Sequence, residues 1–201
     1  DDMIRSEQPI GEVIESSTPQ FSVACYQLHQ APPFGTLVRA SRMDGGGWVY
    51  GLVYDVTTGS EPPGAQVTVR GRADLHDDAI YRAYPDLSEV MRTRFSALTV
   101  GFSDGGVIRQ YLPPLPPPLH YSVYGCAPEE VRAFNDQLVY LGTILGNLHV
   151  PADELAAAAI RQARQSRPQD PDFALRAGRQ LALLLKEEYD RLRGILGRIG
   201  V

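Results

Sequence analysis

The stretch GTLVRASRMDGGGWVYGLVYDV, residues 35–56, carries the pattern that decides the fold class. Two runs rich in β-branched and aromatic residues, 35–42 and 48–56, flank the turn sequence DGGG. Glycine and aspartate readily adopt the backbone conformations that tight turns require. The stretch therefore predicts two antiparallel strands joined by a short turn.

Strand patterns of the same kind recur on both sides of this hairpin, separated by turn sequences such as STPQ, TGSEPPG and SDGG. Many short strands joined by short turns are typical of a small barrel rather than of a parallel sheet. We therefore predict a closed antiparallel β-barrel of six or more strands over residues 9 to 126. The other predicted strands are IGEVIE (10–15), FSVACYQL (21–28), AQVTVRG (65–71), SALTVGF (96–102), VIRQYL (107–112) and HYSVYG (120–125).

A proline-rich run, LPPLPPPLH at residues 112–120, interrupts the strand pattern. Proline fixes φ and lacks an N–H group, so neither a helix nor a sheet interior tolerates this run. We predict an extended polyproline II strap that crosses the surface and leads into the closing strand. The alternative, a PxxP ligand for an SH3-type domain, requires the run to be free and mobile.

The chain changes character near residue 128, where strand patterns give way to helical ones. Pro128 precedes two glutamates, an arrangement that favours a helix start. Residues 74–94 are too polar and irregular for a strand and predict one or two short helices within the barrel region. The sequence thus predicts a mainly β protein, with a barrel over 1–127 and about three α-helices over 128–201.

Three segments of the chain resemble the amino-terminal barrel of the HerA family of hexameric DNA-translocating ATPases. These segments are IGEVIESSTPQFSVAC (10–25), FGTLVRASRMDGGGWVYGLVYDV (34–56) and FSALTVGFSDGGVIRQYLPPLPPPLHYSVYGCAPEEV (95–131). The module, called the HAS barrel, shares its fold with the crown of rotary ATP synthase subunits. The resemblance covers about residues 9 to 132 and implies a barrel that builds rings and docks partner proteins.

A HerA translocase continues into an ATPase domain with the phosphate-binding loop G-x-x-x-x-G-K-[ST]. The nearest match here is GTILGN at residues 142–147, which has neither the lysine nor the hydroxyl and lies in a helical pattern. The chain's one lysine, Lys186, lies elsewhere. We therefore expect no nucleotide cofactor and no hydrolysis or tight binding of ATP.

Other signs of catalysis or metal binding are weak. The histidines lack the HxxxH or HxH spacing that places two imidazoles on one face. The loop sequence DLHDD, with Asp74, His76, Asp77 and Asp78, could hold a hard cation, but clustered carboxylates repel one another without a turn glycine. We expect no metal site, no catalytic residues and no enzymatic activity. The four histidines are His29, His76, His120 and His149.

Composition limits the compartment and the kind of partner. The net charge of −5 argues against a chain that grips nucleic acid along its whole surface. No apolar run approaches the roughly 20 residues of a membrane span, and the start DDMIRSEQPI is unlike a signal peptide. We expect a soluble, cytoplasmic protein in which Cys25 and Cys126 are buried thiols.

The C-terminal region contains an apolar stripe with spacings of three and four residues, which is typical of one face of a helix. The stripe has two interpretations, which are compatible: packing against the two preceding helices, or pairing with another chain. Its residues are Leu181, Leu185, Tyr189, Leu192, Leu196 and Ile199.

Two hypotheses for function follow. The first is a non-enzymatic assembly or adaptor protein that binds a protein partner, such as an ATPase or a nuclease. It would be a homo-oligomer, with a dimer through the tail favoured over a ring because the ATPase contacts of the ring are missing. The strand at residues 47–56, which is aromatic and uncharged until Asp55, would invite aggregation if it were exposed in a monomer, which also favours self-association.

The second hypothesis is a nucleic-acid-associated accessory factor related to HerA-type DNA processing. Arginines would contact phosphates, and Tyr50 and Tyr54 would stack on bases. The competing interpretation places these side chains on a solvated strand face and a barrel edge. The candidate arginines are Arg39, Arg42, Arg70 and Arg72.

Overall fold

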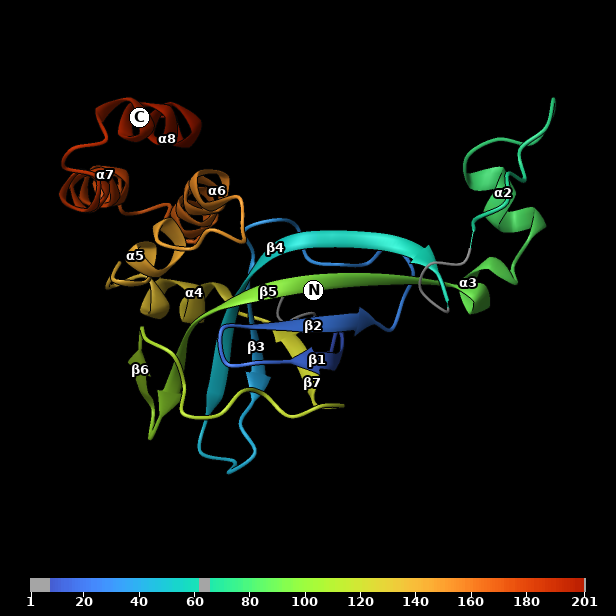
Figure 1. Cartoon of the computed structure of the whole chain (residues 1–201), viewed down its shortest axis with the longest axis horizontal. Helices are drawn as coiled ribbons and strands as arrows, with labels where there is room; N and C mark the ends of the chain where they lie inside the picture. Colours follow the sequence, from blue (N-terminus) through green and yellow to red (C-terminus); the bar gives the residue numbers. More distant parts are fainter. Residues whose placement is uncertain (1–7, 62–65, 201) are drawn as a thin grey trace.

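A closed antiparallel β-barrel forms the centre of the computed structural model, which describes residues 8–61 and 66–200 (Figure 1). Six strands pair in the order β2-β1-β7-β3-β4-β5, and β5 pairs again with β2 to close the barrel. The short strand β6 (Val107–Arg109) pairs with β5 outside this ring. The barrel strands are β1 (Gly11–Ser16), β2 (Gln20–Cys25), β3 (Leu37–Ser41), β4 (Trp48–Ser60), β5 (Met91–Asp104) and β7 (Ser122–Gly125).

Alternating side chains fill the interior of the barrel. In β3, Val38 and Ala40 point into the barrel, and Leu37 points out of it toward the helices. Period-two alternation places every second residue on one face of a strand. Small residues complete the fit: a Cβ at Gly51 would lie 2.7 Å from the ring of Phe21. The predicted closed barrel is confirmed.

The proline-rich run is the predicted surface strap. Residues 112–119 contain no helix or strand, and β7 follows them between β1 and β3. The Ser16 hydroxyl donates a hydrogen bond of 2.5 Å to the carbonyl of Pro117, and the N–H of His120 donates one of 2.8 Å to Val13. These bonds hold the strap against β1.

The described residues contain seven helices, of which five follow residue 127, where the sequence predicts about three. The C-terminal helices pack on the outer face of the barrel, where Leu52 and Leu98 join Leu141, Ile160 and others in one apolar cluster. The helices are α2 (Asp78–Ala83), α3 (Leu87–Val90), α4 (Pro128–Phe134), α5 (Tyr140–Leu145), α6 (Ala152–Gln165), α7 (Phe173–Leu184) and α8 (Tyr189–Ile199).

Two further predictions are wrong. The strand expected at 65–71 begins outside the described residues, and residues 66–71 form no strand. Val69 is 90% exposed there, so the apolar alternation has no sheet to join. The tail is not one helix, because the chain turns at residues 185–188 and lets α8 pack on α6 and α7.

Candidate functional site

A cluster of polar side chains joins the barrel to the helical region. Glu130 of α4 accepts a hydrogen bond of 2.9 Å from the Tyr50 hydroxyl and forms an ion pair of 2.8 Å with Arg39. The guanidinium of Arg39 also lies 4.2 Å from the ring centre of Trp48. Burial, followed by the charge and hydrogen bond of Glu130, raises the pKa of Tyr50. We name these four residues the junction cluster.

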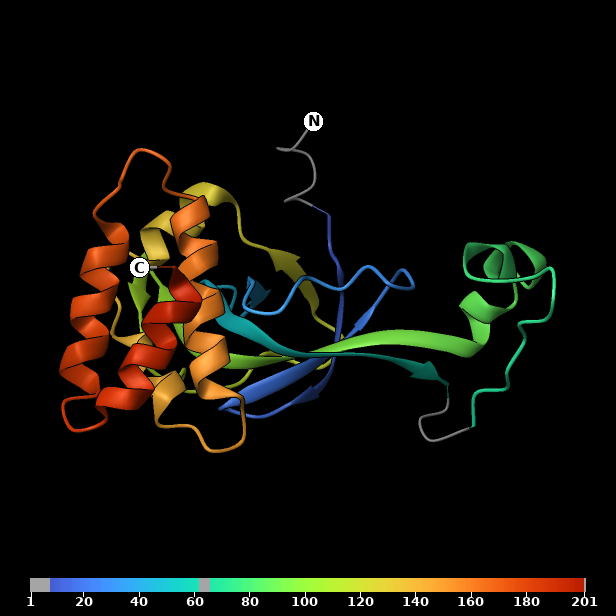
Figure 2. The ribbon, with the colours of Figure 1, turned by 90° about the horizontal axis from the view of Figure 1, so that it is seen from above.

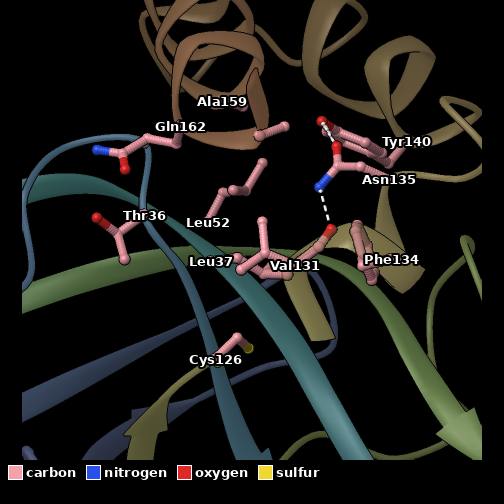
Figure 3. Close-up of a pocket in the computed structure, with 12 residues that line it drawn as sticks. Thr36, Leu37, Leu52, Cys126, Val131, Phe134, Asn135, Tyr140, Ala159 and Gln162 are labelled. Carbon is pink, nitrogen blue, oxygen red and sulfur yellow. Dashed lines mark hydrogen bonds between the residues drawn. The ribbon is translucent and has the colours of Figure 1, made fainter. Parts of the chain in front are cut away.

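A small cavity lies next to the junction cluster (Figure 3). Thr36, Leu52, Cys126 and Gln162 contribute to its wall, together with Phe134. Its volume is about 120 Å³, whereas pockets for drug-sized ligands span about 300–1,000 Å³. No carboxylate, histidine or basic side chain lines the cavity, so its wall offers no acid–base pair. We interpret this cavity as a packing void.

The opposite wall of the cavity shows how the helices are held in place. The Tyr140 hydroxyl donates a hydrogen bond of 2.7 Å to the side-chain oxygen Oδ1 of Asn135, and the side-chain N–H of Asn135 donates one of 2.8 Å to the backbone carbonyl of Val131 (Figure 3). Burial raises the pKa of Tyr140, so this phenol stays protonated. The buried Gln110 amide adds bonds to the carbonyls of Phe134 and Gln137. These contacts hold α4, α5 and the loop between them in place.

The two cysteines are poor nucleophiles. Cys25 is buried in the barrel, and desolvation raises its pKa to about 11. Burial, and then the negative charge of Glu130, raise the pKa of Cys126. Cys126 keeps some exposed surface, which corrects the expectation of full burial. Only the thiolate reacts, so both thiols are held in the unreactive form.

Native protein at pH 8 should therefore react slowly with an aromatic disulfide reagent. With a pKa of about 11, only about one Cys25 side chain in a thousand is ionised at that pH. Both cysteines should react rapidly once guanidinium unfolds the chain, as measured by release of the coloured thiolate. A fast-reacting thiol in the native protein would contradict this prediction.

The apolar stripe of the tail is largely covered within the chain. Leu181, Leu185 and Ile199 are buried in the cluster shared with the barrel, and Leu192 and Leu196 pack against it. Tyr189 is the exception, with 71% of its surface exposed. The stripe thus packs within the helical bundle, and little of it remains for pairing with another chain.

The four candidate arginines do not form one surface. Arg39 belongs to the junction cluster, and Arg42 bonds the Ser103 carbonyl at 3.1 Å and pairs with Asp44. Arg70 lies far from the barrel, over the ring of Tyr84, and Arg72 is exposed nearby. Their charges are therefore dispersed or paired with acidic side chains.

The two candidate stacking tyrosines also have structural contacts. Tyr50 is only 3% exposed and its ring packs against Phe134, so it cannot serve as a stacking platform. Tyr54 packs partly against the shared apolar cluster and donates a hydrogen bond of 2.9 Å to Gln20. These neighbours are distant in sequence, so no local pattern predicted them.

The DLHDD loop stays open. Asp74, His76, Asp77 and Asp78 are all exposed, and His76 bonds the Ala73 carbonyl at 3.1 Å. Within residues 8–61 and 66–200, no group of three or more acidic, histidine or cysteine side chains could hold a metal ion.

The feature that sequence reasoning missed is a long arm, which we define as residues 55–61 and 66–94. Beyond the barrel, β4 and β5 continue as a two-stranded ribbon that ends in α2 and α3 (Figure 2). The arm projects away from the helical region on the opposite side of the barrel (Figure 2). Helix α2 buries none of its residues, and Val67 and Val69 near the tip are exposed.

The two edges of the arm differ. On the β5 side, β2 pairs with β5 as far as Arg94, and the loop after β2 then contacts the ribbon through side chains: the N–H of His29 donates to the Thr93 hydroxyl at 2.7 Å, and the His29 ring bonds the Tyr81 hydroxyl at 2.9 Å. On the β4 side, the last paired residue is Val53, which exchanges hydrogen bonds with Gly35 and Thr36. From Asp55 to Gly59, no described residue pairs with this edge of β4.

The open edge also corrects the expectation for the strand at 47–56. Its first part is paired with β3 and β5 inside the closed barrel and is not an edge. The exposed edge begins where the sequence becomes richer in threonine, DVTTG at 55–59. This segment contains β-branched residues and neither proline nor lysine, the residues that commonly protect an edge.

None of the described helices is long and apolar enough to cross a membrane. No protein-family model matches the chain, and no curated protein matches its sequence.

Proposed function

We propose that this chain is a non-enzymatic assembly module whose copies associate through the projecting arm. The observation that carries the proposal is the uncovered β4 edge, together with the exposed apolar side chains at the tip. A two-stranded ribbon is marginally stable in water, and an open strand edge is a ready template for another chain. An arm of this shape gains stability when a partner covers it.

The resemblance to HAS barrels supports the same proposal. The role of that module in its family is to build rings and dock partner proteins, and the closed six-stranded barrel suits it. A second protein, such as an ATPase or a nuclease, would then bind the assembled form. The proposal moves the self-association surface from the tail to the arm, because the apolar stripe of the tail is covered.

The nucleic-acid alternative has less support. Arg39 and Arg42 are engaged in ion pairs within the barrel region, and Tyr50 is buried. Binding to phosphates would have to compete with Glu130 and Asp44 for these charges. The observations favour a protein interface over a phosphate-binding surface.

An arm-less variant tests the proposed function. Residues 58–93 are replaced by Asn-Gly, a sequence that favours a two-residue hairpin turn between the opposed residues Thr57 and Arg94. We expect the full chain to sediment as an oligomer at micromolar concentration and the variant to sediment as a monomer. A monomeric full chain, or an arm-less variant that still assembles, would overturn the proposal. Circular dichroism checks that the barrel remains folded.

A further inference from the structure

The backbone of the arm shows which groups of the open edge are available. The N–H of Glu61 donates to the carbonyl of Val90, so Glu61 faces β5. Backbone groups alternate along a strand, so Asp55, Thr57 and Gly59 face β5 as well. The N–H and C=O groups of Val56 and Thr58 therefore point outward along the open edge. The bulge at Tyr54 explains why Val53 also faces outward.

This edge is complementary to itself. We infer that two copies of the chain pair their β4 strands antiparallel, with the two-fold axis at Thr57. Val56 then lies opposite Thr58 of the second copy, and each such pair exchanges both backbone hydrogen bonds. A two-fold axis requires one surface patch to fit its own copy, and this register satisfies that requirement. The inference rests on the proposed function and names its partner and contact.

Charge complementarity supports this register. Asp55 lies opposite Gly59 of the second copy, and Gly59 is itself paired with Arg92 within its own chain. A Cβ placed at Gly59 would meet nothing within 4 Å, so the space beside it is open in the single chain. The carboxylate of Asp55 would fill this space and approach the guanidinium of Arg92 of the second copy, which already pairs with Glu61 of its own chain at 2.8 Å. Because Glu61 also pairs with Arg94, these three side chains keep one net positive charge for Asp55. Opposite charges on one face of a sheet stabilise strand pairing.

The edge on the other side of the arm offers less backbone to a partner. Strand β2 already pairs with residues 94–98 of β5, so only residues 91–93 of that edge remain, and the loop that carries His29 lies beside Thr93. The β4 edge is open over a longer segment, because the nearest loop stops at Gly35 and Thr36 beside Val53. The available segment, residues 55–59, is symmetric about Thr57.

A disulfide at the two-fold axis tests the register. Thr57 would face its own copy as a non-hydrogen-bonded pair, with Cα atoms about 4.5 Å apart, which suits a disulfide. We expect Thr57→Cys to form a covalent dimer under mild oxidation, seen on non-reducing gels. The matched control is Val56→Cys, also exposed, whose Cα atoms would lie about 8 Å apart and should not be bridged. The unreactive Cys25 and Cys126 leave a low background in the wild type.

The outcomes separate the two proposals. If the full chain assembles through its arm but Thr57→Cys does not cross-link, the register is wrong and the proposed function stands. Equal cross-linking of Thr57→Cys and Val56→Cys would indicate random collision and also overturn the register. A tip-less variant, with residues 60–91 replaced by Asn-Gly between the opposed Gly59 and Arg92, keeps the edge and should still dimerise. Loss of the dimer in this variant would assign the contact to the tip.

Charge reversal gives a second, independent measurement. Asp55→Arg should raise the dissociation constant of the dimer by about tenfold, because two like charges then meet across Gly59. The same reversal at the exposed Glu15, on β1, is the matched control and should leave the constant unchanged. Combining Asp55→Arg with Arg92→Glu should restore dimerisation, as measured by sedimentation equilibrium, and Arg92→Glu alone, which also breaks the pair with Glu61, measures the cost to the arm itself. A double variant no better than Asp55→Arg would contradict the predicted contact.

Discussion

Replacing Gly35 with alanine is expected to destabilise the protein by about 3 kcal/mol. Gly35 has a φ of 85°, in the left-handed region that disfavours any side chain. A Cβ at this position would lie 2.6 Å from the Cβ of Ala158 and 3.0 Å from its carbonyl carbon, which belongs to α6. The destabilisation caused by backbone strain and the destabilisation caused by forcing α6 away from the barrel therefore add. Thermal unfolding should show a melting temperature lower by roughly 6–12 °C.

Gly45→Ala separates the two causes. Gly45 also has a positive φ, of 67°, but a Cβ there would meet nothing within 4 Å. This variant should lose about 1 kcal/mol, from backbone strain alone. Ala158→Gly provides a further check, because it removes the methyl group that the new side chain would meet. In the Ala158→Gly variant, Gly35→Ala should lower the melting temperature by less than it does in the wild type. If Gly35→Ala and Gly45→Ala destabilised the protein equally, the packing argument would be contradicted.

The contact at Gly35 matters because α6 approaches the barrel very closely. The run Ala156 to Ala159 is almost completely buried, and its small side chains let the helix backbone lie against the loop before β3. In the sequence this alanine run shows only a preference for helix. Its role in close packing depends on the loop before β3, which is distant from α6 in the sequence.

The barrel could be predicted because its signal is local. Alternation in β3 and the turn sequence DGGG each depend on a few neighbouring residues. The segment AQVTVRG shows the limit of that reasoning, because it has strand-like alternation and Val69 is nevertheless exposed. Whether such a segment joins a sheet depends on an available edge, which lies outside its own sequence.

The break in the tail and the length of the arm were missed for a related reason. Residues 185–188 contain neither proline nor glycine, so the periodicity continues through them. The turn is stabilised by distant contacts: Leu185 is buried, and Arg191 pairs with Asp153 at 2.7 Å. Likewise β4 continues beyond β3 with no turn sequence that marks the end of the barrel, and the change in composition at residues 55–59 keeps the β-branched pattern of a strand.

The junction cluster shows the same dependence on long-range contacts. The sequence singled out Arg39 and Tyr50 as candidates for contacts with phosphates and bases. Their partner, Glu130, lies 80 residues beyond Tyr50, and in the sequence it indicates only the start of a helix. The residue types at positions 39 and 50 indicated that both side chains make polar contacts. Only the fold shows that their common partner is Glu130.

Glu130→Ala is expected to have the other large effect, a loss of about 3 kcal/mol. The change leaves the guanidinium of Arg39, whose side chain is 22% exposed, without its ion-pair partner and removes the acceptor of the Tyr50 hydroxyl. Removing one partner of a largely buried ion pair leaves an uncompensated charge, and this accounts for most of the effect. The melting temperature should fall by roughly 6–12 °C.

Two comparisons make the junction prediction specific. Glu129→Ala, one residue earlier in α4, removes an exposed ion pair with Arg132 and should leave the melting temperature nearly unchanged. The fluorescence of Trp48, the chain's single tryptophan, should change with Glu130→Ala alone, because Arg39 lies against its ring. Replacing both charges, as in Arg39→Met with Glu130→Leu, should recover much of the lost stability, since no charge is then left unpaired. If Glu130→Ala were as mild as Glu129→Ala, the junction cluster would not hold the helices to the barrel, and apolar packing alone would carry that contact.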